Sequence, residues 1–167
     1  DAHAISTSAA GATSVYSADV DGDGDIDVLS ASSHPESEKV AWHENDGNEN
    51  FTEHLISNTA NGANIVDAED VDGDGDIDVL SSSDGKIVWY ENDGTQNFTE
   101  RIISTGPCHP SCIHASDVDG DGDMDILSSG LNSCIDNNTS WYENDGSENF
   151  TEHIIDEQNS SYIYSSD

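Results

Sequence analysis

The sequence predicts an all-β protein made of propeller-type blades, each of them a four-stranded antiparallel sheet. A block of about fifty residues occurs three times along the chain. Each block holds short runs rich in Val, Ile, Leu, Trp and Phe, separated by Asp, Asn and Gly, which is the pattern of short strands joined by turns. No stretch shows sustained helical periodicity. Four strands in a repeat of roughly 40–50 residues are typical of a propeller blade.

Two landmarks recur in every block. Residues 19–27 read Asp-Val-Asp-Gly-Asp-Gly-Asp-Ile-Asp, and this acidic motif returns at 70–78 and, with Met124 in place of isoleucine, at 117–125. The second landmark is Trp-His-Glu-Asn-Asp-Gly at 42–47, which returns as Trp-Tyr-Glu-Asn-Asp-Gly at 89–94 and 141–146.

The strands of the first repeat are expected at 14–18, 26–32, 39–44 and 51–56. The acidic motif then lies between the first and second strands. Asn-Asp-Gly lies between the third and fourth strands, where it predicts a hairpin because these residues tolerate positive φ.

The chain is expected to form a single repeat array over 1–167, with repeats at approximately 12–58, 62–105 and 109–157. Residues 1–7 resemble the end of a preceding repeat and 161–167 the start of a following one, so we expect an orphan strand at each end. Propellers close with four to eight blades, and open sheet edges invite pairing with another chain. We therefore expect further repeats in a longer chain, or copies that complete one another in an oligomer or filament.

The composition restricts the partners. The chain has 36 Asp and Glu against 3 Lys and Arg, and its formal net charge is -33. A packed domain of this charge repels itself unless it is neutralised, and divalent cations are the natural candidate. No basic patch is present to contact phosphate, which excludes nucleic acid and anionic membrane surfaces. No apolar run is long enough for membrane insertion, and no signal peptide is visible.

The acidic motif has the chemistry of a calcium-binding loop. Ca²⁺ takes six to eight oxygen ligands, and a loop with Asp at positions 1, 3, 5 and 9 and Gly at position 6 can wrap around it. We expect one ion per repeat, about three in all. The expected side-chain ligands are Asp19, Asp21, Asp23 and Asp27, then Asp70, Asp72, Asp74 and Asp78, then Asp117, Asp119, Asp121 and Asp125, while Asp25, Asp76 and Asp123 supply backbone carbonyls.

An EF-hand, a plain turn and a magnesium site each fit the motif less well than a calcium loop between strands. An EF-hand loop shares its first nine positions, but position 12 is Ser30, Ser81 or Ser128 instead of Glu, and the flanks are strand-like. A plain Asp-Gly turn accounts for one copy more easily than for three copies in the same register. In addition, carboxylates clustered without a cation would repel one another. Magnesium demands octahedral geometry and retains its waters.

The pattern Asp-x-Asp-x-Asp-Gly-x-x-Asp resembles the calcium loop of the FG-GAP or VCBS repeat family, which integrin α-subunit propellers also carry. The resemblance covers nearly the whole chain. It implies propeller blades with calcium between their first two strands, in a secreted or cell-surface protein. The Phe-Gly and Gly-Ala-Pro segments that name the family are absent. The Trp-(Tyr/His)-Glu-Asn-Asp-Gly hairpin looks more like repeats of large secreted proteins of aquatic microbes and algae, which weakens any inference of integrin-like ligand binding.

The three cysteines, Cys108, Cys112 and Cys134, fit one disulfide and one free thiol. Such a bridge would place the chain in an oxidising compartment. Half a zinc site in the segment from Cys108 to His114 is the alternative, although no fourth ligand is obvious beyond Cys134.

Further repeated residues have surface or packing roles in our interpretation. N-glycosylation sequons begin at Asn50, Asn97, Asn137, Asn138, Asn149 and Asn159. His3, His54 and His153 share one repeat position and are expected at the surface. Trp42, Trp89 and Trp141, with Phe51, Phe98 and Phe150, are expected to fill the space between blades, with stacking on sugar rings as the alternative.

The sequence favours a structural or adhesive module and no enzyme, because no nucleophile–base–acid set or phosphate-binding glycine loop stands out. The alternative is a carbohydrate- or protein-binding propeller that uses the irregular loops at 33–38, 107–113 and 132–138. A fragment of a polysaccharide-degrading enzyme is a third hypothesis. The sequence does not single out a catalytic pair for it, because acidic residues are too abundant to identify a glycosidase pair.

Overall fold

The computed structural model describes residues 4–35, 37–106, 110–130 and 139–156, and all regular secondary structure in these ranges is β-strand. The strands are β1 (Ala12–Ala18), β2 (Asp27–Ser32), β3 (Lys39–Asn45), β4 (Phe51–Ser57), β5 (Ile65–Glu69), β6 (Asp78–Ser83), β7 (Lys86–Asn92), β8 (Phe98–Ser104), β9 (Pro110–Ser116), β10 (Asp125–Gly130), β11 (Thr139–Asn144) and β12 (Phe150–Asp156). In the same ranges no helix has the length and apolar character needed to cross a membrane.

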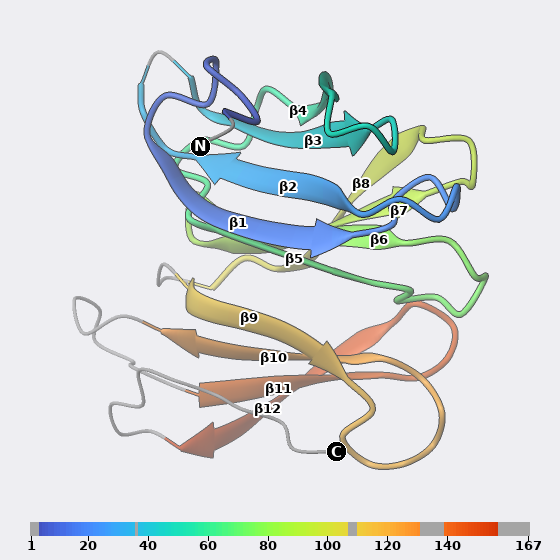
Figure 1. Cartoon of the computed structure of the whole chain (residues 1–167). Helices are drawn as coiled ribbons and strands as arrows, with labels where there is room; N and C mark the ends of the chain where they lie inside the picture. The colour runs from blue at the N-terminus through green and yellow to red at the C-terminus, as the bar shows by residue number, and fades with distance from the viewer. Residues whose placement is uncertain (1–3, 36, 107–109, 131–138, 157–167) are drawn as a thin grey trace.

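The strands form three four-stranded antiparallel sheets, which confirms the predicted fold class. We name them blade 1 (β1–β4), blade 2 (β5–β8) and blade 3 (β9–β12). Within each blade the strands pair in chain order, so β1, β5 and β9 each form one edge and β4, β8 and β12 the other. The three first strands lie next to one another, with β5 between β1 and β9 (Figure 1). Propeller blades stack around a central axis in this way.

Each blade has two faces because side chains alternate along a strand. We name the face that carries the tryptophan of the third strand face B, and the opposite face A. Leu29 and Trp42 on face B of blade 1 belong to one buried cluster with Val66, Val79 and Tyr90 on face A of blade 2. The core of this contact therefore lies between sheets.

The contact between blades 2 and 3 repeats this arrangement. Leu80 and Trp89 on face B of blade 2 cluster with Ile126 and Tyr142 on face A of blade 3. Phe150 packs edge-on to the Trp89 ring, with ring centroids 6.3 Å apart. Trp42 and Trp89 thus fill the space between blades, as predicted. Full burial of one large apolar side chain stabilises a fold by about 1.5–3 kcal/mol, so these contacts are a major source of stability.

A buried asparagine ties blade 2 and blade 3 each to the acidic loop of the blade before it. Asn92 Nδ2 donates to the carbonyl of Val20 at 3.3 Å, and Asn144 Nδ2 donates to the carbonyl of Val71 at 3.4 Å. Both asparagines end the third strand of their blade and are at most 3% exposed. The equivalent Asn45 Nδ2 donates to the carbonyl of Ile26 in its own blade, and makes no bond to another blade among the residues that the structure describes.

The first strands are also joined by polar contacts. His114 Nδ1 on β9 lies 3.2 Å from Asp67 Oδ2 on β5, and the backbone N–H of Ala115 donates to the same oxygen. Burial raises the pKa of Tyr16 on β1, and the Asp67 carboxylate raises it further. Asp67 therefore interacts with both neighbouring blades.

The expected orphan strands are not among the strands described. Residues 4–11 contain no strand, so that prediction is wrong for residues 4–7. An extended segment becomes a strand only when a neighbour pairs its backbone groups, whereas this segment contacts Glu53 of β4 through the hydroxyls of Ser6 and Ser8. The second predicted strand, at 161–167, lies outside the described residues.

We expect Asn92→Ala to lower the free energy of unfolding by about 1–3 kcal/mol, because it leaves buried acceptors without their donor. Asn45→Ala is the matched control, since its amide makes no described bond to another blade. Urea unfolding of both variants measures the difference. An equal loss in the two variants would show that the bond between blades contributes nothing.

Candidate metal centres

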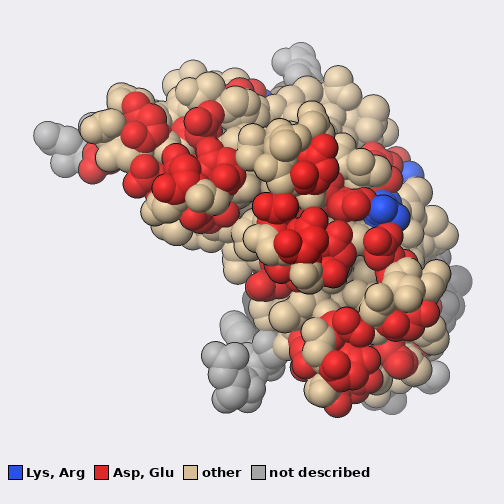
Figure 2. Space-filling model, turned by 90° about the vertical axis from the view of Figure 1, so that its right-hand side faces the viewer, with Lys and Arg blue, Asp and Glu red and all other residues tan. Residues whose placement is uncertain are grey.

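The three acidic loops lie on one face of the molecule. Each joins the first strand of a blade to the second, on the right-hand side of Figure 1. Figure 2 shows that acidic side chains gather in clusters over this face, with few basic ones between them. Much of the negative charge of the chain is therefore concentrated at one end of the blades.

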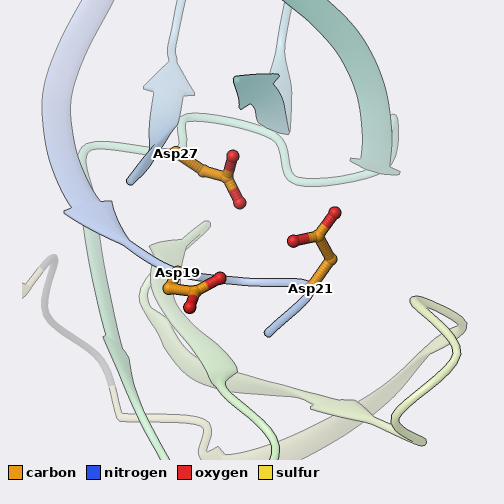
Figure 3. A group of neighbouring side chains, drawn as sticks. All are labelled: Asp19, Asp21 and Asp27. Carbon is orange, nitrogen blue, oxygen red and sulfur yellow. The ribbon is translucent and has the colours of Figure 1, made fainter. Parts of the chain in front are cut away.

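Three carboxylates converge in each loop. Asp19 and Asp21 follow β1 and Asp27 begins β2, and their side chains point toward a common space (Figure 3). One carboxylate oxygen of each lies within 4.8 Å of the other two. The equivalent groups are Asp70, Asp72 and Asp78, and Asp117, Asp119 and Asp125. Oxygens this close can share one hard cation, so each blade holds one group able to bind a metal ion.

Backbone hydrogen bonds fix the aspartate at position 9 of the motif. Asp27 Oδ2 accepts the N–H of Val20 at 3.0 Å, and Asp27 Oδ1 accepts the N–H of Asn45 at 2.8 Å. Asp78 and Asp125 accept the equivalent pairs of bonds, and all three are 0% exposed. This carboxylate therefore joins the start of the loop, the second strand and the end of the third strand.

The aspartate at position 1 closes the loop. Asp19 Oδ2 accepts the N–H of Gly24 at 3.0 Å, and Gly24 adopts a φ of 97°, which glycine permits without strain. The other oxygen, Asp19 Oδ1, is buried and accepts no hydrogen bond from the described residues, and the same holds for Asp70 Oδ1. A buried carboxylate oxygen without a partner is unfavourable. A cation within the group of three carboxylates would supply that partner.

The carboxylates within each acidic loop repel one another, and burial also disfavours their charged forms. Burial raises the pKa of Asp78 to about 7, even though the N–H groups of Asn92 and Val71 favour its charged form. Burial also raises the pKa of Asp21 and of Asp72, and neighbouring carboxylates raise both further. A bound cation favours the charged forms and would remove this penalty.

Positions 5 and 7 of the motif lie outside the converging groups. Asp23 Oδ1 accepts the N–H of Asp25 at 2.8 Å, so a ligand role for Asp23, Asp74 and Asp121 stays a prediction. The Asp25 side chain faces the β3–β4 hairpin so closely that a Cβ on Gly47 would overlap its carboxylate. Asp76 faces Gly94, and Asp123 faces Gly146, in the same way.

Sequence reasoning missed this contact between the loop and the hairpin. The signal was that all three copies carry aspartate at position 7. A residue expected to bind the ion through its backbone carbonyl needs no particular side chain, so the repeated aspartate indicates a separate role for the side chain.

A groove of about 390 Å³ lies between blades 1 and 2, beside the first acidic loop. Its lining includes Asp21, Trp42, Glu44 and His54 from blade 1 and Thr95, Gln96 and Phe98 from blade 2. The His54 ring stacks on Trp42 with centroids 4.5 Å apart, and His54 Nε2 lies 2.6 Å from Glu44 Oε2. The groove thus presents carboxylate, amide and hydroxyl groups next to aromatic rings.

An ion pair occupies the equivalent place between blades 2 and 3. Arg101 Nη1 lies 2.6 Å from Glu148 Oε2, across the junction of the two blades. Arg101 also lies over the Trp89 ring and contacts Glu91. Arg101 and Glu148 hold the repeat positions of His54 and Gln96, so the two junctions differ in whether a pair of charges crosses them.

The sequon asparagines at the hairpins have a structural role. Asn50 Nδ2 donates to Asp46 at 2.9 Å, and Asn97 and Asn149 make the equivalent bonds to Asp93 and Asp145. Together with bonds from Thr95, this contact lowers the pKa of Asp93 to about 2. Glycosylation at these sites stays a prediction, and Asn137, Asn138 and Asn159 lie outside the described residues.

The predicted disulfide and zinc site fall largely outside the described residues. Cys112 is a half-buried free thiol on β9, while Cys108 and Cys134 are not described. His114 contacts Asp67. In the ranges that the structure describes, the groups able to hold a metal are the three aspartate groups.

Comparison with known proteins identifies the repeats. The family model described as FG-GAP-like repeat matches residues 19–81 and 70–128. No curated protein matches the chain significantly. A solved structure of an Agrocybe aegerita lectin, described for its specific recognition of non-reducing terminal N-acetylglucosamine, aligns with a TM-score of 0.60 at 17% identity. The alignment covers 86% of this chain but only 39% of the lectin chain, and at this identity the likeness concerns the fold alone.

We expect Gly94→Ala to destabilise the chain more than Gly73→Ala. Both glycines have positive φ, 72° and 76°, so both alanines carry a strain of about 1–2 kcal/mol. Only at Gly94 would the new Cβ also overlap the Asp76 carboxylate, since Gly73 faces open space. Urea unfolding at saturating calcium measures the difference in free energy of unfolding between the two variants. The double variant Asp76→Ala/Gly94→Ala should lack the additional loss of stability that the overlap causes. If the additional loss persists in the double variant, the contact between Asp76 and Gly94 is contradicted.

Proposed function

This chain belongs to the FG-GAP-like repeat family, and we propose that it is a non-enzymatic, calcium-binding structural or adhesive module, of the VCBS type, that acts outside the cell. The observation that carries the proposal is the convergence of three aspartates of the acidic motif in each blade. The repeated geometry supports one ion per blade.

The chemistry of the groups favours calcium over other metals. The converging atoms are carboxylate oxygens, which are hard ligands, and the groups contain no His or Cys that would suit zinc or copper. Asp19, Asp21 and Asp27 would hold the first ion, and the backbone carbonyl of Asp25 is the expected further ligand. The buried, unpartnered Asp19 Oδ1 fits such an ion. When bound, the ion supplies positive charge among carboxylates that otherwise repel one another.

The proposed role of the metal is structural. The Asp27 carboxylate already fixes the loop to β2 and β3 through backbone bonds, and a shared ion would add Asp19 and Asp21 to this joint. Binding free energy then becomes folding free energy. We place the module outside the cell, where calcium-binding modules have dissociation constants of roughly 10⁻⁴–10⁻³ M and where stable blades can serve a matrix or an adhesive surface.

Calcium titration by calorimetry tests this function. We expect about three calcium ions to bind per chain, one in each group of three converging aspartates. Each site should stabilise the fold by about 2.7 kcal/mol at a free calcium concentration one hundred times its dissociation constant. A chelator should correspondingly lower the melting temperature. A melting temperature indifferent to both calcium and chelator would refute a structural role.

Asp72→Asn should reduce the number of bound ions by one, because it removes a charged oxygen from the second group. Asp84→Asn is the charge-matched control, since Asp84 lies in the exposed β6–β7 turn, outside all three groups. Calorimetry of the two variants at the same ionic strength separates loss of a ligand from loss of general negative charge. Equal stoichiometry in both would remove Asp72 from the site.

A glycan-binding role is the second candidate, and the groove between blades 1 and 2 favours it. Sugar hydroxyls pair with carboxylates and amides, here Asp21, Glu44 and Gln96, while pyranose rings pack on aromatic surfaces. The fold shared with a lectin of Agrocybe aegerita is consistent with this candidate. The site would lie at the junction of two blades, beside a calcium loop.

Exchanging the groove residues tests the glycan hypothesis. His54→Arg/Gln96→Glu places the charge pair of the second junction across the groove, so it should abolish binding of N-acetylglucosamine oligosaccharides. Arg101→His/Glu148→Gln removes the bridge at the second junction and should add a second site. Calorimetry reports the stoichiometry. Unchanged binding in both variants, or none in the unmodified chain, would reject the groove as a sugar site.

A further inference from the structure

Among the residues that the structure describes, no blade covers face A of blade 1, whereas a preceding blade covers face A of blades 2 and 3. Val15 on β1 is 67% exposed, whereas its repeat equivalents Val66 and Ile113 are 3% and 4% exposed because the preceding blade covers them. Ile26, at the end of the first acidic loop, is 56% exposed, whereas the equivalent Ile77 packs against the cluster between blades 1 and 2. Blade 1 thus presents the receiving half of a blade contact.

Blade 3 presents the other half of that contact. Val118 is 43% exposed, whereas the equivalent Val20 and Val71 are 3% and 1% exposed. Ile155 on β12 is 58% exposed, while the equivalent Ile56 and Ile103 pack against the clusters between blades. These residues are the ones that a following blade covers in blades 1 and 2.

These exposures do not simply reflect a position on a strand edge. Leu55, Ile102 and Ile154 share one repeat position on the fourth strands and are 54%, 50% and 52% exposed. Their exposure is therefore the same whether or not a neighbouring blade is described. Val15 and Val118, by contrast, are far more exposed than their repeat equivalents, which a neighbouring blade covers.

The polar groups of the two faces match as well. Asn92 and Asn144 donate to the carbonyls of Val20 and Val71 of the preceding blade. By repeat position, Asn45 is the equivalent donor on blade 1, and the carbonyl of Val118 is the equivalent acceptor on blade 3.

One of the two existing junctions also carries a pair of charges. Arg101 of blade 2 pairs with Glu148 of blade 3 across their junction. The equivalent positions at the two outer faces are His153 on blade 3 and Glu49 on blade 1. By repeat position, these two residues face each other if blade 1 of one molecule follows blade 3 of another.

We propose that face A of blade 1 in one copy of this chain packs against face B of blade 3 in a second copy, and that two such contacts close a ring of two copies. The interface continues the one that already joins blades 1, 2 and 3. It is heterologous, with different surfaces in contact, and such interfaces form closed rings when the rotation allows. Two copies supply six blades, within the range of four to eight that close a propeller.

This inference goes beyond the proposed function, since none of the apolar contact residues is a predicted metal ligand. Calcium affects it only through charge, because two copies with a formal charge of -33 each repel one another. Association is therefore best measured with calcium saturating and at physiological ionic strength.

Analytical ultracentrifugation of the chain and three variants tests the proposal. The unmodified chain should sediment with twice the 17.8 kDa mass of one copy. Val15→Glu and Ile155→Glu, each altering one face, should sediment as single copies. Ile102→Glu is the control, because it adds the same charge at an equally exposed position that no blade covers, and it should remain a pair.

Mixing the two single-face variants gives the sharpest result. Each retains the face that the other lacks, so the mixture should form a one-to-one pair that is weaker than the unmodified pair. A single-copy mass for the unmodified chain, failure of the mixture to pair, or equal disruption by Ile102→Glu would overturn the proposal. Masses larger than two copies would overturn the closed ring. Calorimetry measures the number of bound calcium ions independently of the mass. A chain that binds about three ions but does not pair would overturn this proposal and leave the proposed metal sites standing.

Discussion

A buried carboxylate at the first residue of each second strand is the group on which the rest of the blade depends. Asp27, Asp78 and Asp125 are 0% exposed, and each accepts one N–H from the acidic loop and one from the end of the third strand. A carboxylate in this position is stable only with such partners. Loop, strand pairing and hairpin are therefore held in one arrangement by the same side chain that also faces the proposed metal.

The same hydrogen bonds connect the candidate metal centres of neighbouring blades. Asp27 accepts from the N–H of Val20, whose carbonyl accepts from Asn92 Nδ2. The backbone N–H of Asn92 in turn donates to Asp78. The series continues through Val71 and Asn144 to Asp125. A contiguous set of contacts thus joins all three acidic loops, and the ordering of one loop is mechanically tied to the next.

Much of this organisation could be predicted from the sequence because it repeats. The spacing of the acidic motif and of the Asn-Asp-Gly hairpin predicted the blades and their strand order. The aspartates at positions 1, 3, 5 and 9 were predicted as side-chain ligands, and those at positions 1, 3 and 9 converge in the structure. Contacts between repeats were harder to predict, since no periodicity within one repeat encodes them. The Asn92 bond to Val20 and the Asp25 contact with the Gly47 turn depend on how sheets stack. The strand expected at residues 1–7 shows the same limit, because a strand needs a partner as well as a pattern.

The stacking of the blades has a consequence for how the molecule comes apart. The three central residues of β5, the first strand of blade 2, are buried, whereas no residue of β1, the first strand of blade 1, is buried. In an array where each unit contacts only its neighbours, stability is a sum of unit and junction contributions. Within a single copy, the middle blade has two junctions and each outer blade has one. In a single, unpaired copy the amide protons of β6 should therefore exchange with solvent last, and the array should fray from its ends toward a persistent centre.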